Sequence, residues 1–132
     1  MKRIALSCSL LILAVAVVVC LPAPIGATGV EGRSYSYTTF EDVPHTGCAQ
    51  FAVGGTFLVD VDSIGYDGTW RERRFRRLSL FRAHVEHEGI NYFAHGLMPR
   101  AGKIVGTSYQ AIEGGWVVKF EADETGCTPV AP

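Results

Sequence analysis

The chain has 132 residues, 48% of them hydrophobic, and its twelve Lys and Arg residues face thirteen Asp and Glu residues, for a formal net charge of −1. Such a balance argues against a protein whose whole surface attracts nucleic acid, although a local basic patch can still bind an anion. A chain of this length accommodates one folded domain.

The first 27 residues have the layout of a secretory signal peptide. Lys2 and Arg3 give a positive start, residues 10–19 form an uncharged apolar run, and two prolines follow. The run is too short to cross about 30 Å of hydrocarbon comfortably, which disfavours a transmembrane anchor. We therefore expect export, to the periplasm or to the outside of the cell, with cleavage after Ala23 or Ala27.

Removal of this segment leaves a single β domain over residues 28–132. This mature chain holds ten basic residues, thirteen acidic residues and two cysteines, Cys48 and Cys127. In an oxidising compartment, an even pair without CxxC spacing is most simply one structural disulfide. Closing so long a loop would stabilise the fold by about 4 to 5 kcal/mol on the chain-entropy model.

Strands account for most of this domain. The fifteen glycines of the chain and its many β-branched and aromatic residues favour β structure, and apolar side chains repeat at period two in several segments. Strands are expected over residues 34–40, 57–62, 81–86, 103–112 and 116–122. Turn signals separate them at Gly54-Gly55, Asp67-Gly68, Glu88-Gly89, residues 99–102 and Gly114-Gly115. About seven or eight short strands predict an antiparallel sandwich or a small closed or partly closed barrel.

The stretch WRERRFRRLSLF (70–81) is the most unusual part of the sequence. A two-residue turn at Asp67-Gly68 would bring arginines onto the apolar face, where unpaired guanidinium groups are too costly to bury. We therefore predict a longer loop or a bulge. Its pairs would be Val61 with Phe75, Asp62 with Arg74 and Asp60 with Arg76. The segment is expected to project past the core or to lie at an edge.

A short helix over residues 70–81 is the alternative, and it would make the fold α+β. Thr69 and Glu72 have capping-box spacing, and Phe75, Leu78 and Phe81 fall within one helical arc. Arginines fall in that same arc, which favours the strand interpretation.

The arginine run is a candidate anion-binding site. Guanidinium groups match phosphate and sulfate groups, so the partner of an exported protein would be an anionic surface polymer or lipid head groups, with nucleic acid less suited. The competing interpretation is the solvated face of a strand. The residues concerned are Arg71, Arg73, Arg74, Arg76 and Arg77.

Three further features of the sequence indicate a function less strongly. His84, Glu86 and His95 are candidate metal ligands, because His84 and Glu86 share one face of a strand, but their spacing matches neither zinc-protease helix signature. No serine sits in a GxSxG motif, and no catalytic set is coherent. The segment 95–102 is expected to be an exposed contact loop carrying Leu97, Met98 and Arg100.

These observations favour an exported, non-enzymatic β domain without a cofactor, which binds an anionic surface or another protein. A barrel that carries a hydrophobic small molecule is the first alternative, and a small secreted hydrolase or metal-dependent enzyme is the second. No recognisable motif identifies the ligand, the oligomeric state, the cell envelope type or whether the sheet closes on a cavity.

Overall fold

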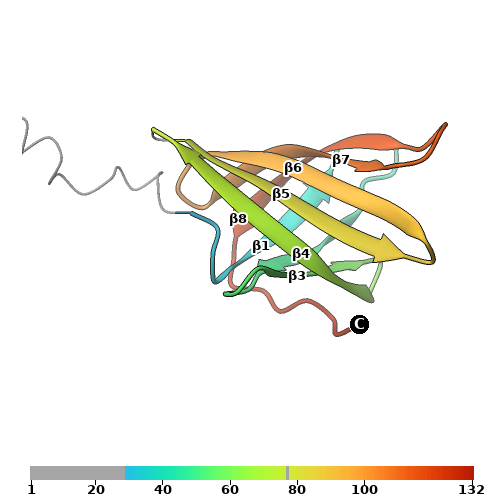
Figure 1. The fold of residues 1–132 in the computed structure, drawn as a ribbon, viewed down its shortest axis with the longest axis horizontal. Helices are drawn as coiled ribbons and strands as arrows, with labels where there is room; N and C mark the ends of the chain where they lie inside the picture. Colours follow the sequence, from blue (N-terminus) through green and yellow to red (C-terminus); the bar gives the residue numbers. More distant parts are fainter. Residues whose placement is uncertain (1–28, 77) are drawn as a thin grey trace, which may run out of the picture.

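The computed structural model describes residues 29–76 and 78–132, so the expected signal peptide and Arg77 lie outside the described residues. The described chain is all β. Its eight strands are β1 (Arg33–Thr39), β2 (Thr46–Phe51), β3 (Thr56–Val61), β4 (Ile64–Phe75), β5 (Leu78–His87), β6 (Ile90–Arg100), β7 (Lys103–Gln110) and β8 (Val117–Glu124). Each strand pairs antiparallel with the next, and β8 pairs with β1, which closes the sheet into a barrel (Figure 1).

Of the two expected architectures, the closed barrel is therefore the correct one. The predicted alternation decides which side chains face inward: Phe57, Phe81, Ala83 and Val85 are buried in the interior. A barrel of about eight strands is just wide enough to be filled by side chains or to hold one small ligand. Within the described residues, no helix is long and apolar enough to cross a membrane.

The predicted turn at Asp67-Gly68 is wrong, because both residues lie inside β4. The chain reverses at Asp62 and Ser63, whose φ angles of 51° and 67° match a two-residue turn that joins Val61 to Ile64. Gly68 is there for a different reason: a Cβ at this position would collide with the carbonyl of His84 on β5. The glycine permits a close approach between β4 and β5. The wrong prediction arose because an Asp-Gly pair in a sequence also has the composition of a turn.

The pairings that depended on this turn are also wrong. Val61 lies opposite Ile64 and not Phe75, while Asp60 lies opposite Gly65 and Arg74 lies opposite Ser79. No Asp–Arg ladder therefore forms across β3 and β4.

The alternative helix over residues 70–81 is contradicted too. β4 continues to Phe75, the chain turns at Arg76 with a φ of 55°, and β5 begins at Leu78. Trp70 and Phe81 both point into the core at strand spacing, and a helix would forfeit the ladder that residues 79–81 form with β6. The prediction that this segment extends past the core is confirmed: β3 pairs with β4 only as far as Thr69, and residues 71–75 pair with β5 alone.

The expected loop over residues 95–102 is strand. β6 runs to Arg100, and Gly102, with a φ of 75°, completes a tight turn into β7. Pro99 lies where the β6–β7 register shifts, a position at which a strand tolerates a residue without an N–H donor. Met98 is only 1% exposed, so it belongs to the core and not to a contact loop.

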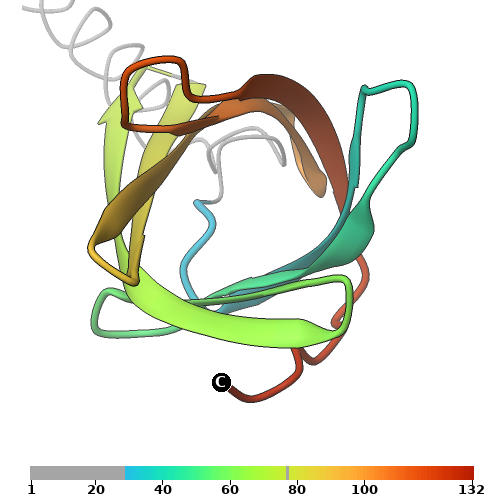
Figure 2. The same cartoon turned by 90° about the vertical axis from the view of Figure 1, so that its right-hand side faces the viewer.

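One end of the barrel is closed by packed side chains. Val30, which precedes β1, is fully buried, and Phe51 lies at the centre of an aromatic cluster. The ring of Phe51 has centroid distances of 4.8 Å to Phe81, 5.2 Å to Phe57 and 5.7 Å to Trp70. Figure 2 shows the barrel end-on, with the segment before β1 lying within its outline. The buried aromatic rings and Val30 seal this end.

The C-terminal segment is fastened to the outside of the barrel. The predicted disulfide is present between Cys48 on β2 and Cys127 beyond β8. Asp60 accepts hydrogen bonds from the backbone N–H groups of Cys48 and Val130, each at 2.8 Å. Asp60 is only 8% exposed and serves as a structural anchor, in place of the solvent-facing partner for arginine that the sequence pattern indicated.

Candidate functional site: the barrel interior

The barrel encloses a cavity of about 510 Å³. It extends from the aromatic cluster at the closed end to Glu41, His45 and His87. The side chains of these three residues are 38%, 41% and 49% exposed, so the cavity opens to solvent at the end that carries the β1–β2, β3–β4, β5–β6 and β7–β8 connections. This open end faces the viewer in Figure 2.

Apolar side chains form most of the cavity wall. Every strand contributes, because inward-facing residues alternate with outward-facing ones along each strand of a barrel. Small residues leave the space open: Ala49, Ala83 and Ala94 line the cavity where larger side chains would fill it. The larger lining residues include Tyr66, Val85, Tyr92, Ile104, Trp116, Val118 and Phe120.

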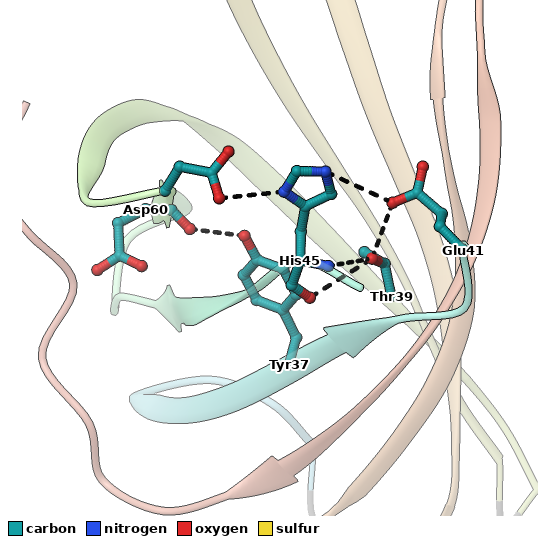
Figure 3. A network of polar contacts seen from close by, with 6 residues as sticks. Tyr37, Thr39, Glu41, His45 and Asp60 are labelled. Carbon is teal, nitrogen blue, oxygen red and sulfur yellow. Dashed lines mark hydrogen bonds and ion pairs between the residues drawn. The ribbon is translucent and has the colours of Figure 1, made fainter. Parts of the chain in front are cut away.

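A polar network surrounds one side of the opening (Figure 3). The hydroxyl of Thr39 donates to Glu41 at 2.9 Å and accepts from the backbone N–H of His45 at 2.8 Å. His45 Nδ1 lies 3.0 Å from Asp62 Oδ1, and its Nε2 lies 3.9 Å from Glu41 Oε2. The imidazole is therefore held between two carboxylates, which come from the β1–β2 and β3–β4 connections.

This arrangement changes the protonation of His45. Its hydrogen bond to the Asp62 carboxylate raises the pKa of His45, and the negative charges of Asp62 and Glu41 act in the same direction. The histidine is thus biased toward its charged form, which is paired with the two carboxylates at the opening of the cavity.

Two tyrosines of β1 contribute to the wall of the cavity. Tyr37 donates to the backbone carbonyl of Asp60 at 2.7 Å. Tyr35 is fully buried, and its hydroxyl has no hydrogen-bond partner among the described residues. Burial raises the pKa of both phenols, so both remain neutral donors at physiological pH. The Tyr35 hydroxyl is covered by surrounding atoms, and the polar groups of Tyr37 and Ser108 donate within the protein, so these three groups leave the wall largely apolar.

The predicted metal ligands do not gather into a site. In the described part of the chain, no group of three His, Cys, Asp or Glu side chains is placed to hold a metal ion. His84 Nε2 is hydrogen-bonded to Asn91 at 2.7 Å and its ring stacks on Phe93. His95 stacks on Tyr109 with ring centroids 5.7 Å apart. These histidines belong to an aromatic cluster on the outer face of β5, β6 and β7.

The predicted anion-binding arginines lie on or next to the β4–β5 hairpin, away from the opening of the cavity. Arg71 and Arg73 are exposed on the outer face of β4, and Arg76 is in the turn. Arg74 is also exposed, with its Nε 3.7 Å from Glu72. The structure thus separates two features, the opening of an internal cavity at one end and an arginine-bearing hairpin at the other.

Sequence reasoning missed most of the cavity residues. Tyr35, Ala49 and Ala94 have no motif, and a strand pattern places a residue inward without saying whether the interior is filled. The one available signal was the presence of small residues at inward positions such as Ala83, which is uninformative until the barrel diameter is known.

Comparisons with protein-family models, with curated proteins and with solved structures find no match to this chain. The features of this chain that indicate a function are the geometry of the cavity and of the hairpin.

Proposed function

We propose that the protein binds a hydrophobic small molecule inside its barrel. The observation that carries this proposal is the cavity of about 510 Å³ with apolar walls. Its size lies within the range of about 300 to 1,000 Å³ that is usual for small-molecule sites. A largely apolar interior with few polar groups favours ligand carriage over catalysis, because the hydrophobic effect supplies binding while the polar groups set the orientation.

The polar groups indicate how such a ligand is oriented. His45 and Glu41 offer charged groups at the opening of the cavity, whereas the Tyr35 hydroxyl is covered by the protein and Tyr37 donates to a backbone carbonyl. A ligand with one polar group, such as a carbonyl or hydroxyl, would place that group at the opening, next to His45 and Glu41. Its main body is apolar, since it contacts side chains such as Val59, Phe120 and Val118.

Titration with a neutral fluorescent probe tests the proposal. N-phenyl-1-naphthylamine is suitable because it has no charge to bind the arginines outside the barrel. We expect saturable binding by the wild type. Ala94→Phe should weaken it by about tenfold or more, since the added ring occupies the cavity. Ala131→Phe is the matched control, because it adds the same ring at an exposed position outside the barrel.

Ala49→Phe provides a second test on a different strand, in case Ala94→Phe does not fold. Circular dichroism of each variant establishes that the barrel is intact. Non-saturable binding by the wild type, or unchanged binding by a folded cavity-filling variant, would overturn the proposal.

A further inference from the structure

The β4–β5 hairpin extends beyond the rest of the barrel at its closed end, at the upper left of Figure 1. β3 pairs with β4 only up to Thr69, so residues 71–75 have a strand neighbour on one side alone. The outer face of the hairpin is consequently accessible and is separate from the opening of the cavity.

Apolar side chains cover the tip of this outer face. Phe75 is 65% exposed, and Leu78 and Leu80 are each 42% exposed. Phe75 lies opposite Leu78 in the register, and Leu80 follows two residues later on the same face. Exposed apolar side chains that adjoin one another in this way are characteristic of surfaces that contact another molecule.

Arginines lie immediately behind this apolar tip. On the same face, Arg73 is opposite Leu80 and Arg71 is opposite Arg82, while the guanidinium of Arg76 lies 5.6 Å from the ring centroid of Phe75. Among the arginines of this hairpin that the structure describes, Arg74 is the one that pairs with a carboxylate, that of Glu72. The side chain of Glu72 is only 14% exposed and is hydrogen-bonded to Ser79. Among the described residues from 71 to 82, the exposed charge of the hairpin is therefore positive.

The arrangement of an apolar tip with cationic groups behind it favours one class of binding partner over the others. A second copy of the chain would bring like-charged arginines together, which is destabilising. A soluble polyanion would pair with the arginines but leave Phe75, Leu78 and Leu80 in water. A bilayer with anionic head groups engages both sets, because apolar side chains enter the acyl boundary while guanidinium groups bind the phosphates.

We infer that the β4–β5 hairpin docks the protein on the surface of an anionic phospholipid bilayer, with Phe75 and Leu78 inserted below the head groups and Arg71, Arg73 and Arg82 at the level of the phosphates. This attachment leaves the opposite, open end of the barrel free. A barrel that carries an apolar ligand would thereby be held next to the phase in which such a ligand dissolves.

Vesicle co-sedimentation tests this inference. The sample is the chain that begins at Thr28, because the apolar run of residues 10–19 would bind vesicles by itself and all eight strands and the disulfide lie beyond it. Vesicles of phosphatidylcholine alone are compared with vesicles containing one third phosphatidylglycerol, across a salt series. We expect binding that requires phosphatidylglycerol and weakens steeply with salt.

Two pairs of substitutions separate the two contributions. Arg71→Ala with Arg73→Ala should weaken vesicle binding by about tenfold or more. Phe75→Ser with Leu78→Ser should weaken vesicle binding to a similar degree. Binding to heparin, a soluble polyanion that contacts the arginines alone, is measured in parallel and should be unchanged by this second pair. Val117→Ser is the matched control, because Val117 is 71% exposed on β8, away from the hairpin.

Insertion itself is read from a tryptophan reporter. Phe75→Trp should show a blue-shifted emission, relative to wild type, when phosphatidylglycerol vesicles are added, whereas Val117→Trp should not. Equal binding to neutral and anionic vesicles would overturn the inference. Vesicle binding that is insensitive to Phe75→Ser with Leu78→Ser would also overturn it and would indicate a polyanion site. Dimerisation in solution that covers the hairpin would overturn it as well. Probe binding in the cavity is measured separately, so failure of either proposal leaves the other testable.

Discussion

At the scale of single residues, the carboxylates Asp60 and Asp62 have different tasks although they are two positions apart on one chain. Asp60 is buried and fastens Cys48 and Val130 through their backbone N–H groups. Asp62 is exposed and holds His45 at the opening of the cavity. The alternation of side chains along a strand does not distinguish these tasks, because residues two positions apart are expected on the same face. Their environments do, since one is covered by the C-terminal segment.

His45 should titrate above its ordinary pKa of 6.5, because the Asp62 carboxylate stabilises the imidazolium. A raised pKa in the folded state means that this pair contributes its stability below pH 6.5 and loses it as the pH rises through the raised value. NMR titration of the imidazole protons measures this pKa directly. Asp62→Asn should return it toward the ordinary value, and Glu41→Gln should have a smaller effect. An unshifted pKa in the wild type would contradict the geometry.

At the scale of the elements, the β3–β4 turn shows how local backbone geometry defines register. Asp62 and Ser63 both have positive φ, although only glycine adopts this region without steric cost. The Asp67-Gly68 pair, which has the composition of a turn, is instead accommodated within β4 by its close contact with β5. Moving the turn by five residues carries the arginines away from β3 and into the projecting part of β4.

Ser63→Gly should stabilise the barrel by about 0.5 to 1 kcal/mol, because it converts the turn to Asp-Gly and removes the strain of a left-handed serine. Chemical denaturation of wild type and variant measures this difference. Ser63→Ala is the control: it removes the same hydroxyl without adding conformational freedom, so it should not stabilise. A stabilised alanine variant would assign the effect to the hydroxyl and contradict the backbone explanation.

At the scale of the whole molecule, the cavity depends on closure between distant parts of the chain. β1 pairs with β8, and the disulfide joins residues 79 positions apart. The two proposed binding surfaces occur at opposite ends of this closed barrel, so each can be occupied without excluding the other. Both depend on the same frame, because the cavity wall and the outer face of the hairpin are the two sides of β4 and β5.

Loss of the disulfide should lower the free energy of unfolding by about 2 to 5 kcal/mol, because the unfolded chain regains the freedom of a long closed loop. Urea denaturation of the oxidised protein, of the reduced protein and of the double variant Cys48→Ala with Cys127→Ala measures this change. The reduced protein and the double variant should agree. Equal stability of all three would show that the C-terminal segment is held by Asp60 and its packing alone.

The linear sequence is enough to predict the β class, the alternation of inward and outward side chains, the Cys48–Cys127 pair and the projection of the arginine segment. These features depend on local periodicity or on pairwise chemistry, which a linear pattern encodes. The folded arrangement is needed to see that the sheet closes, that Gly68 is a close contact and not a turn, that Met98 is buried, and that the interior is hollow. Closure and internal volume depend on how residues from all eight strands meet at one place, and no segment read separately specifies that meeting.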